Sequence, residues 1–148
     1  MTTEIIATSR AEQQIATLSR THAKALDVFI NELGPNGCRA LGYRLTGQTP
    51  LDRICVKHLR DNLRAVVAFE KPERIWILLV GPHDDKDPNR DVYTELYAIL
   101  GTEPPNAEGR AKPSCCGEDG QPPAGLGDDL ADIIIRSVKQ RRTRARAR

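Results

Sequence analysis

The sequence predicts an α+β domain in which a helical hairpin packs on a small antiparallel sheet. Apolar residues recur at helical spacing in the first third of the chain. Three segments between residues 53 and 80 then have the composition and patterning of strands, and a short capped helix ends at Gly101. We therefore expect one domain at residues 4–101, a flexible linker at 102–125 and a basic helix or tail at 126–148.

The first elements are a short strand and a capped helix. Ile5 and Ile6 predict the strand. Ser9 and Glu12 then fit a capping box, in which the serine accepts a hydrogen bond from a free helix amide and the glutamate reaches back. Ile15 continues this helix along one face.

A second helix follows and forms a hairpin with the first. Ser19 offers its cap, and the segment 34–37, Gly-Pro-Asn-Gly, ends it. Four apolar residues recur between these points at helical spacing: Leu26, Phe29, Ile30 and Leu33. Residues 38–52 are irregular, apart from an edge strand suggested by Leu41, Tyr43 and Leu45.

Three strands come next. Residues 53–59 alternate between two faces, one of which carries Ile54, Val56 and His58, as in a half-buried strand. Residues 63–69 alternate again, and the apolar run 75–80 is typical of a strand covered on both faces. The short turn at 71–73 predicts that these two strands pair as an antiparallel hairpin. Asp87 and Pro88 then predict a helix start, as N-cap and first helical residue.

The composition changes after Gly101. Residues 102–125 are rich in proline, glycine and small polar residues, so they bury too little surface to offset their ordering entropy. Residues 126–140 regain a helical pattern with a narrow apolar stripe that needs a partner. The basic residues that follow it predict attachment to RNA phosphates: Arg141, Arg142, Arg144, Arg146 and Arg148. A helix that folds back on its own domain and a solvated tail remain alternatives.

Charge and cysteine usage limit the class of protein. The net charge is +2, and the positive charge is concentrated in the tail. Cys55 is expected to be a small buried hydrophobe, whereas the adjacent Cys115 and Cys116 could oxidise or contribute to a metal site. With no CxxC pair and no histidine near them, we expect no metal. The sequence shows neither a signal peptide nor an apolar run of about 20 residues, so we expect a soluble, cytoplasmic protein without a membrane partner.

Three short motifs follow one another in the second half of the predicted domain. They are Leu59-Arg-Asp-Asn-Leu-Arg64, Leu79-Val-Gly-Pro-His83 and Arg90-Asp-Val-Tyr93. Their succession resembles the RelE/ParE family of bacterial toxins from type II toxin–antitoxin modules. In that family a helical hairpin precedes a small antiparallel sheet, and the last strand leads through a basic or histidine-bearing loop into a final helix. The resemblance covers roughly residues 4–101.

The resemblance implies a catalytic site. RelE-type members cut messenger RNA on the ribosome without a metal, with the ribose 2′-hydroxyl as nucleophile. Arg64 would hold the scissile phosphate, and His58 would act as base or charge stabiliser. His83 would be the acid, and Tyr93 would stack on a base or orient the phosphate. Arg60 is a further candidate for RNA binding, and no cofactor is implied.

Simpler interpretations of single residues remain open. The two arginines fit a solvated strand face, His58 fits a packed, hydrogen-bonded histidine, and Tyr93 alone fits a core position. The chain also has fewer basic residues on its strands than RelE. The loop after Gly81 carries Asp84, Asp85 and Asp87, which repel phosphate. Its segment 83–85, His-Asp-Asp, could also be an ordinary acidic turn or a weak metal site. A site is predicted only because all four catalytic candidates fit the single arrangement that the family resemblance implies.

The expected function is therefore that of a toxin component, an mRNA interferase that inhibits translation. Its expected partners are a cognate antitoxin, the ribosome and mRNA, and no oligomeric state is indicated. Two alternatives stay open: a ParE-like toxin that inhibits a topoisomerase without cutting nucleic acid, and a non-toxic binding module of the same fold. Convergence of His58, Arg64 and His83 would favour the nuclease.

Overall fold

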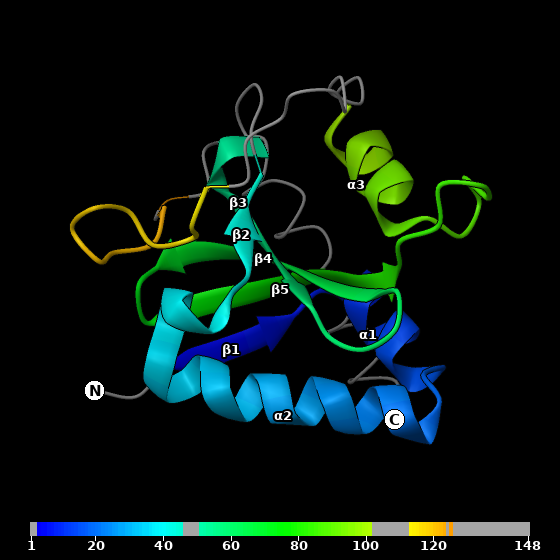
Figure 1. Cartoon of the computed structure of the whole chain (residues 1–148), viewed down its shortest axis with the longest axis horizontal. Helices are drawn as coiled ribbons and strands as arrows, with labels where there is room; N and C mark the ends of the chain where they lie inside the picture. Colours follow the sequence, from blue (N-terminus) through cyan, green and yellow to red (C-terminus); the bar gives the residue numbers. More distant parts are fainter. Residues whose placement is uncertain (1–2, 46–50, 102–112, 124, 126–148) are drawn as a thin grey trace, which may run out of the picture.

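The structure is a computed structural model that describes residues 3–45, 51–101, 113–123 and 125. The domain has three layers (Figure 1). Helices α1 (Ser9–Ala16) and α2 (Arg20–Asn36) cover one face of a five-stranded sheet, and α3 (Val92–Leu100) covers the other. The α+β class and the helical hairpin expected from the sequence are confirmed.

The sheet is mixed and not purely antiparallel. Its spatial order is β1-β5-β4-β3-β2. Strands β2 to β5 form antiparallel pairs, whereas β1 runs parallel to β5. The strands are β1 (Glu4–Ala7), β2 (Tyr43–Arg44), β3 (Ile54–His58), β4 (Leu63–Lys71) and β5 (Arg74–Pro82), with short 3-10 turns η1 (Gly37–Ala40) and η2 (Leu51–Arg53) between them. The sequence of the four-residue strand β1 does not indicate whether it runs parallel or antiparallel to its neighbour. The helical crossover that follows β1 sets this direction.

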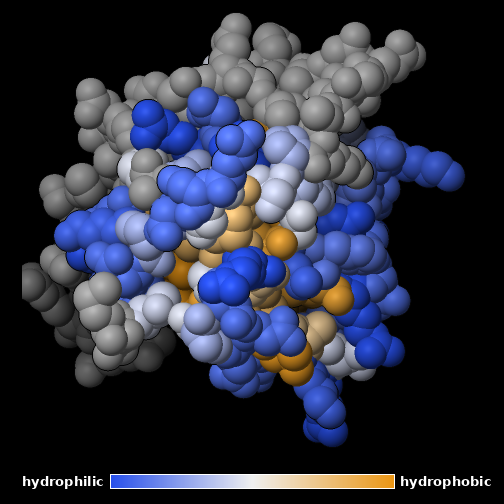
Figure 2. All heavy atoms as spheres, turned by 60° about the vertical axis from the view of Figure 1, so that its left-hand side comes forward, coloured by the Kyte–Doolittle hydropathy of each residue, from blue (hydrophilic) through white to orange (hydrophobic). Residues whose placement is uncertain are grey.

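The core lies on both faces of the central strands. Leu26, Phe29 and Leu33 of α2 pack on one face, and Leu96 of α3 belongs to the cluster on the other. Strand β3 is therefore buried on both faces at its start, rather than half-buried, and only its last residue, His58, is exposed. Figure 2 shows one side of the molecule, on which hydrophilic residues surround the apolar surface.

The cap of the first helix is Thr8 and not Ser9. Thr8 Oγ1 accepts a hydrogen bond from the Ala11 amide at 3.1 Å and donates one to the Leu78 carbonyl at 2.9 Å. The Thr8 amide also donates to Ile77 of β5, which keeps this residue extended as an N-cap requires. The capping box at Ser9 is thus wrong by one residue. Ser19 caps α2 as expected, and α2 ends at Gly37, whose φ of 57° suits glycine.

The last helix begins at Val92, five residues after the expected N-cap. The Asp87 side chain accepts from the Asn89 amide at 3.2 Å and so closes a single turn. Asp91 is the cap, because its carboxylate accepts from both the amide and the hydroxyl of Thr94. The prediction of a helix start at Asp87 is therefore wrong, whereas Gly101 ends α3 in the left-handed conformation as expected.

All four cysteines form disulfides. Cys38 bonds to Cys116 and Cys55 bonds to Cys115. Cys55 is buried as expected, but it is not a free thiol. Residues 113–123, which we call the disulfide segment, thereby lie against the domain beside η1 and β3, while the rest of the expected linker, 102–112 and 124, and the expected basic helix lie outside the described residues.

Candidate functional site

Arg64, His83 and Tyr93 gather where β4 begins and β5 ends. Arg64 pairs with Gly81 of β5 in the antiparallel register, and His83 follows that strand directly. Tyr93 lies in the first turn of α3. Three segments that are separate in the sequence thus bring three of the four catalytic candidates to one corner of the domain.

Tyr93 is the centre of this group. Its ring meets the His83 ring edge-on, with centroids 4.8 Å apart and an interplanar angle of 81°. Its hydroxyl forms a short hydrogen bond with the hydroxyl of Tyr43 on β2. Arg64 is close enough to interact with the same hydroxyl by charge and hydrogen bonding. We call Tyr43, Arg64, His83 and Tyr93 the Tyr93 cluster.

The environment of Tyr93 keeps its phenol protonated. Burial is the largest cause that raises the pKa of Tyr93 far above its ordinary value, and the hydrogen bond with Tyr43 raises it further. The positive charge of Arg64 lowers the pKa, but by less. Tyr93 therefore serves as a neutral hydrogen-bonding and stacking group, and not as a proton-accepting base near neutral pH.

His83 is oriented by a buried carboxylate. Its Nδ1 lies 3.0 Å from Oδ1 of Asp91, and the side chain of Asp91 is only 9% exposed. A proton on Nδ1 satisfies this contact and leaves Nε2 as the nitrogen that faces outward. The side-chain pair has the geometry of a histidine held by a carboxylate, which fixes both the ring orientation and the tautomer.

Asp91 stays ionised because its hydrogen bonds outweigh its burial. Burial raises the pKa of this carboxyl, whereas donors from His83, the Asp84 amide and Thr94 together hold the pKa below its ordinary value. On the outer side, His83 Nε2 lies 3.2 Å from Oδ1 of the exposed Asp85. An exposed carboxylate thus occupies the place where an anionic ligand would meet the imidazole.

His58 and Arg60 do not join this group. His58 pairs with Arg64 across β3 and β4, but its Nε2 hydrogen-bonds to the Asp61 carbonyl in the intervening turn. Arg60 is exposed in the same turn. Both residues line an open groove of about 670 Å³ between α2 and the end of β3. His58 and Arg64 are thus neighbours in the strand register, but the His58 imidazole is hydrogen-bonded to its own turn.

The Tyr93 cluster contains several of the groups that a phosphate transfer needs, but not the candidate base His58. Arg64 supplies a positive charge, His83 a titratable nitrogen and the two tyrosines hydroxyl donors. Among the described residues, no group of three or more histidine, cysteine or acidic side chains is placed to hold a metal ion. The arrangement suits binding of a phosphate-bearing ligand, with proton transfer at His83 Nε2.

Sequence reasoning missed two members of the site. Tyr43 was assigned only to an edge strand, and its partner Tyr93 lies 50 residues away in the chain, so no local pattern reveals the contact. Asp91 was noted only as part of a motif. An Asp followed three residues later by Thr94 is a helix-start pattern that could have located the cap. Arg141, Arg142, Arg144, Arg146 and Arg148 lie outside the described residues.

Comparisons with known proteins were made at the level of sequence and of structure. No family model and no curated protein matches the sequence. Among solved structures, the chain is similar to one from the archaeal RelE–RelB complex of Pyrococcus horikoshii. The TM-score is 0.42 at 17% sequence identity, and the match covers 57% of this chain and 99% of that chain.

Proposed function

We propose that this protein is the toxin component of a toxin–antitoxin pair and that it cuts mRNA on the ribosome. The proposal depends on one observation, the convergence of Arg64, His83 and Tyr93 at the corner between β4, β5 and α3. These are three of the four residues that the RelE/ParE resemblance nominates. The domain around them also has the predicted order of a helical hairpin, a β-meander and a last helix.

In this proposal, Arg64 holds the scissile phosphate and stabilises its charge as the ribose 2′-hydroxyl attacks. His83 gives a proton from Nε2 to the leaving 5′-oxygen, while Asp91 stabilises the imidazole that carries the charge. Tyr93 remains neutral and orients the phosphate or stacks on a base. His58 acts as the base only after it releases the Asp61 carbonyl.

The hydrogen bond that holds His58 to its own turn supports a second candidate function. A ParE-like toxin that inhibits a topoisomerase needs no base at this position. A site in which His58 stays with its turn and Asp85 faces His83 Nε2 fits such a protein equally well. The two functions differ in whether mRNA is cut.

An antitoxin encoded beside this gene is the proposed partner, and the cytoplasm is the proposed location because ribosomes are there. In the part of the chain that the structure describes, no helix is long and apolar enough to cross a membrane. Disulfides are rare in reducing compartments, and this domain has two. A test of its location should therefore also measure whether its cysteines are oxidised or reduced.

The test is induced expression in bacteria, with growth followed and primer extension carried out on cellular mRNA. We expect growth arrest and new mRNA ends. The double variant Arg64→Ala, His83→Gln should remove both, since loss of one positioned charge contact alone costs about 10²–10³ in rate. Lys71→Ala is the matched control, because Lys71 is an exposed cation at the far end of the same strand.

Two results would count against the proposal. Growth arrest with intact mRNA would favour the topoisomerase inhibitor. Harmless expression of the unaltered protein with both disulfides formed, and without an antitoxin, would favour the non-toxic binding module.

A further inference from the structure

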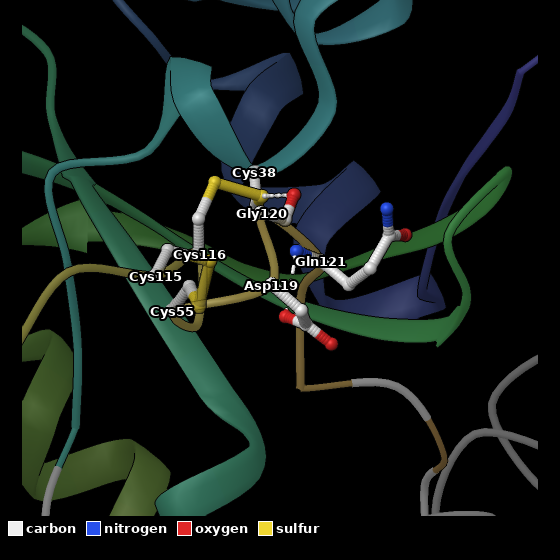
Figure 3. The surroundings of a disulfide bond; sticks show 7 residues. All are labelled: Cys38, Cys55, Cys115, Cys116, Asp119, Gly120 and Gln121. Carbon is white, nitrogen blue, oxygen red and sulfur yellow. Dashed lines mark hydrogen bonds between the residues drawn. A yellow bond between two sulfur atoms is a disulfide. The ribbon is translucent and has the colours of Figure 1, made fainter.

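Two neighbouring cysteines tie the disulfide segment to two separate parts of the domain. Cys116 bonds to Cys38 in η1, and Cys115 bonds to Cys55 in β3. The bonded partners are 78 and 60 residues apart in the chain, with Cα–Cα distances of 5.3 and 5.7 Å. Figure 3 shows both bonds side by side, with the turn 117–121 folded next to them. The two bonds therefore fasten the segment covalently to both of these parts.

The two bonds differ in their access to solvent. Cys55 and Cys115 are almost fully buried, with 0% and 1% of their surface exposed, and Cys38 is buried at 5%. Cys116 alone is half-buried. Because a thiolate must reach a sulfur atom in order to exchange with it, we expect the Cys38–Cys116 bond to react first.

The disulfide segment supports the edge of the sheet. The carbonyl of Pro113 accepts a hydrogen bond from the Arg44 amide at 2.8 Å, on the side of β2 that faces away from β3. Beyond the disulfide segment, the Gly125 amide donates to the Phe69 carbonyl of the interior strand β4 at 2.9 Å. Strand β2 has only two residues, Tyr43 and Arg44, and the amides of Gly42 and Leu45 on either side of it donate to β3. The bond to Pro113 adds an outer contact to this short strand.

The same short strand supplies one side chain of the Tyr93 cluster. Tyr43 precedes Arg44 directly, and its hydroxyl is the one bonded to Tyr93. A continuous path of covalent bonds and hydrogen bonds thus leads from the disulfides through Pro113 and Arg44 to the candidate site. The backbone position of β2 therefore helps to set where the Tyr43 hydroxyl lies relative to Tyr93.

We propose that the two disulfides form a redox switch that holds β2, and with it Tyr43, in the position seen here. In the oxidised protein the Tyr93 cluster is complete. Reduction by a thiol compound releases the disulfide segment, removes the Pro113 acceptor from Arg44 and loosens Tyr43 from Tyr93.

The chemistry is thiol–disulfide exchange in ordered steps. A reductant thiolate attacks Cys116 Sγ, and Cys38 leaves as a thiolate that takes up a proton. A second thiol of the reductant then releases Cys116 and closes the reductant's own disulfide. The Cys55–Cys115 bond reacts afterwards in the same way, so each opened bond consumes two thiols and yields two cysteines.

The consequence for activity depends on the proposed function, whereas the switch itself does not. If the Tyr93 cluster cuts RNA, oxidation makes the protein more active and a reducing environment makes it less active. Transient, sensing disulfides are the kind found in reducing compartments. The switch would then couple toxicity to oxidising conditions.

The test is hydrogen–deuterium exchange, followed by NMR on the full chain before and after treatment with dithiothreitol. The Arg44 and Gly125 amides should exchange at least about tenfold faster after reduction, because both lose or loosen an acceptor. The Thr8 amide, bonded to Ile77 at the opposite edge of the sheet, is the control and should keep its rate. No RNA is used, so failure here is distinct from failure of the proposed function.

Unchanged exchange at Arg44 in protein with four free thiols would overturn the proposal. Equal acceleration at Thr8 would overturn it too, since that reports general loosening. Alkylation at limiting reductant should label Cys38 and Cys116 first, and earlier labelling of the inner pair would contradict the ordered steps. The variant Cys38→Ala, Cys116→Ala keeps the inner bond, so its Arg44 amide should still respond to dithiothreitol; no response there would also refute the switch.

Discussion

Replacing Asp91 by alanine should destabilise the domain far more than replacing Asp87, although both carboxylates lie in the same loop. Asp91 caps α3, and loss of an N-cap costs about 1 kcal/mol. The Asp84 amide, which is part-buried, also loses its acceptor, at about 1 kcal/mol more. We therefore expect about 2 kcal/mol for Asp91→Ala. Asp87→Ala breaks one exposed hydrogen bond in a turn and should cost about 0.5 kcal/mol or less.

Urea unfolding of the three proteins measures this difference. The slope with urea should be the same in all three, so that the midpoints report stability alone. Equal losses in the two variants, or a larger loss for Asp87→Ala, would show that the helix is capped as the sequence first suggested and that Asp91 does not organise the loop.

The pH dependence provides a second check on Asp91. The pKa of this carboxyl is lower in the folded protein than its ordinary value of 3.8. Its contribution is therefore fully present above that ordinary value and is lost as the pH falls through the lowered pKa. The stability gap between the wild type and Asp91→Ala should persist at pH 7 and shrink below about pH 4.

Three further predictions concern binding and ionisation. Asp85→Asn removes the exposed negative charge 3.2 Å from His83 Nε2, so binding of a short RNA should strengthen about threefold at low salt and less at high salt; unchanged binding at both would contradict this. Tyr43→Phe removes one of the causes that raise the pKa of Tyr93, so the ultraviolet titration of that tyrosine should move to lower pH, and an unmoved titration would refute the contact. Truncation after Gly125 should weaken ribosome association and reduce its salt dependence, and an unchanged salt slope would exclude an RNA-binding tail.

The local sequence was sufficient to predict most of the elements. Alternation and apolar runs located β3, β4 and β5, and the turn at 71–73 predicted the hairpin that pairs the last two. Ser19 and Gly101 marked helix ends correctly, because capping depends on a side chain and the few amides beside it. Such signals are local by nature.

Non-local contacts account for what the sequence could not show. The parallel pairing of β1 with β5 depends on how the helical hairpin crosses the sheet. The two disulfides join residues 60 or more positions apart, and a segment without large apolar residues gave no sign of lying against the domain. Competing acidic residues explain the misplaced helix start, since Asp87 and Asp91 both suit an N-cap and only the fold decides between them.

The candidate site was predicted in part for the same reason. The resemblance nominated Arg64, His83 and Tyr93, which the fold brings together. It also nominated His58, whose strand position is next to Arg64 but whose imidazole is bonded to its own turn. Rotamers and hydrogen bonds of exposed side chains depend on local three-dimensional surroundings that a linear motif does not encode.

The most direct test of the central claim is cleavage of a defined mRNA by the purified, oxidised protein, with and without ribosomes. Attack by the ribose 2′-hydroxyl leaves a 2′,3′-cyclic phosphate on one fragment and a 5′-hydroxyl on the other. We expect fragments with these ends only when ribosomes are present, and none with the Arg64→Ala, His83→Gln variant. Intact mRNA on ribosomes that carry the protein, or fragments ending in a 3′-hydroxyl and a 5′-phosphate, would contradict the account.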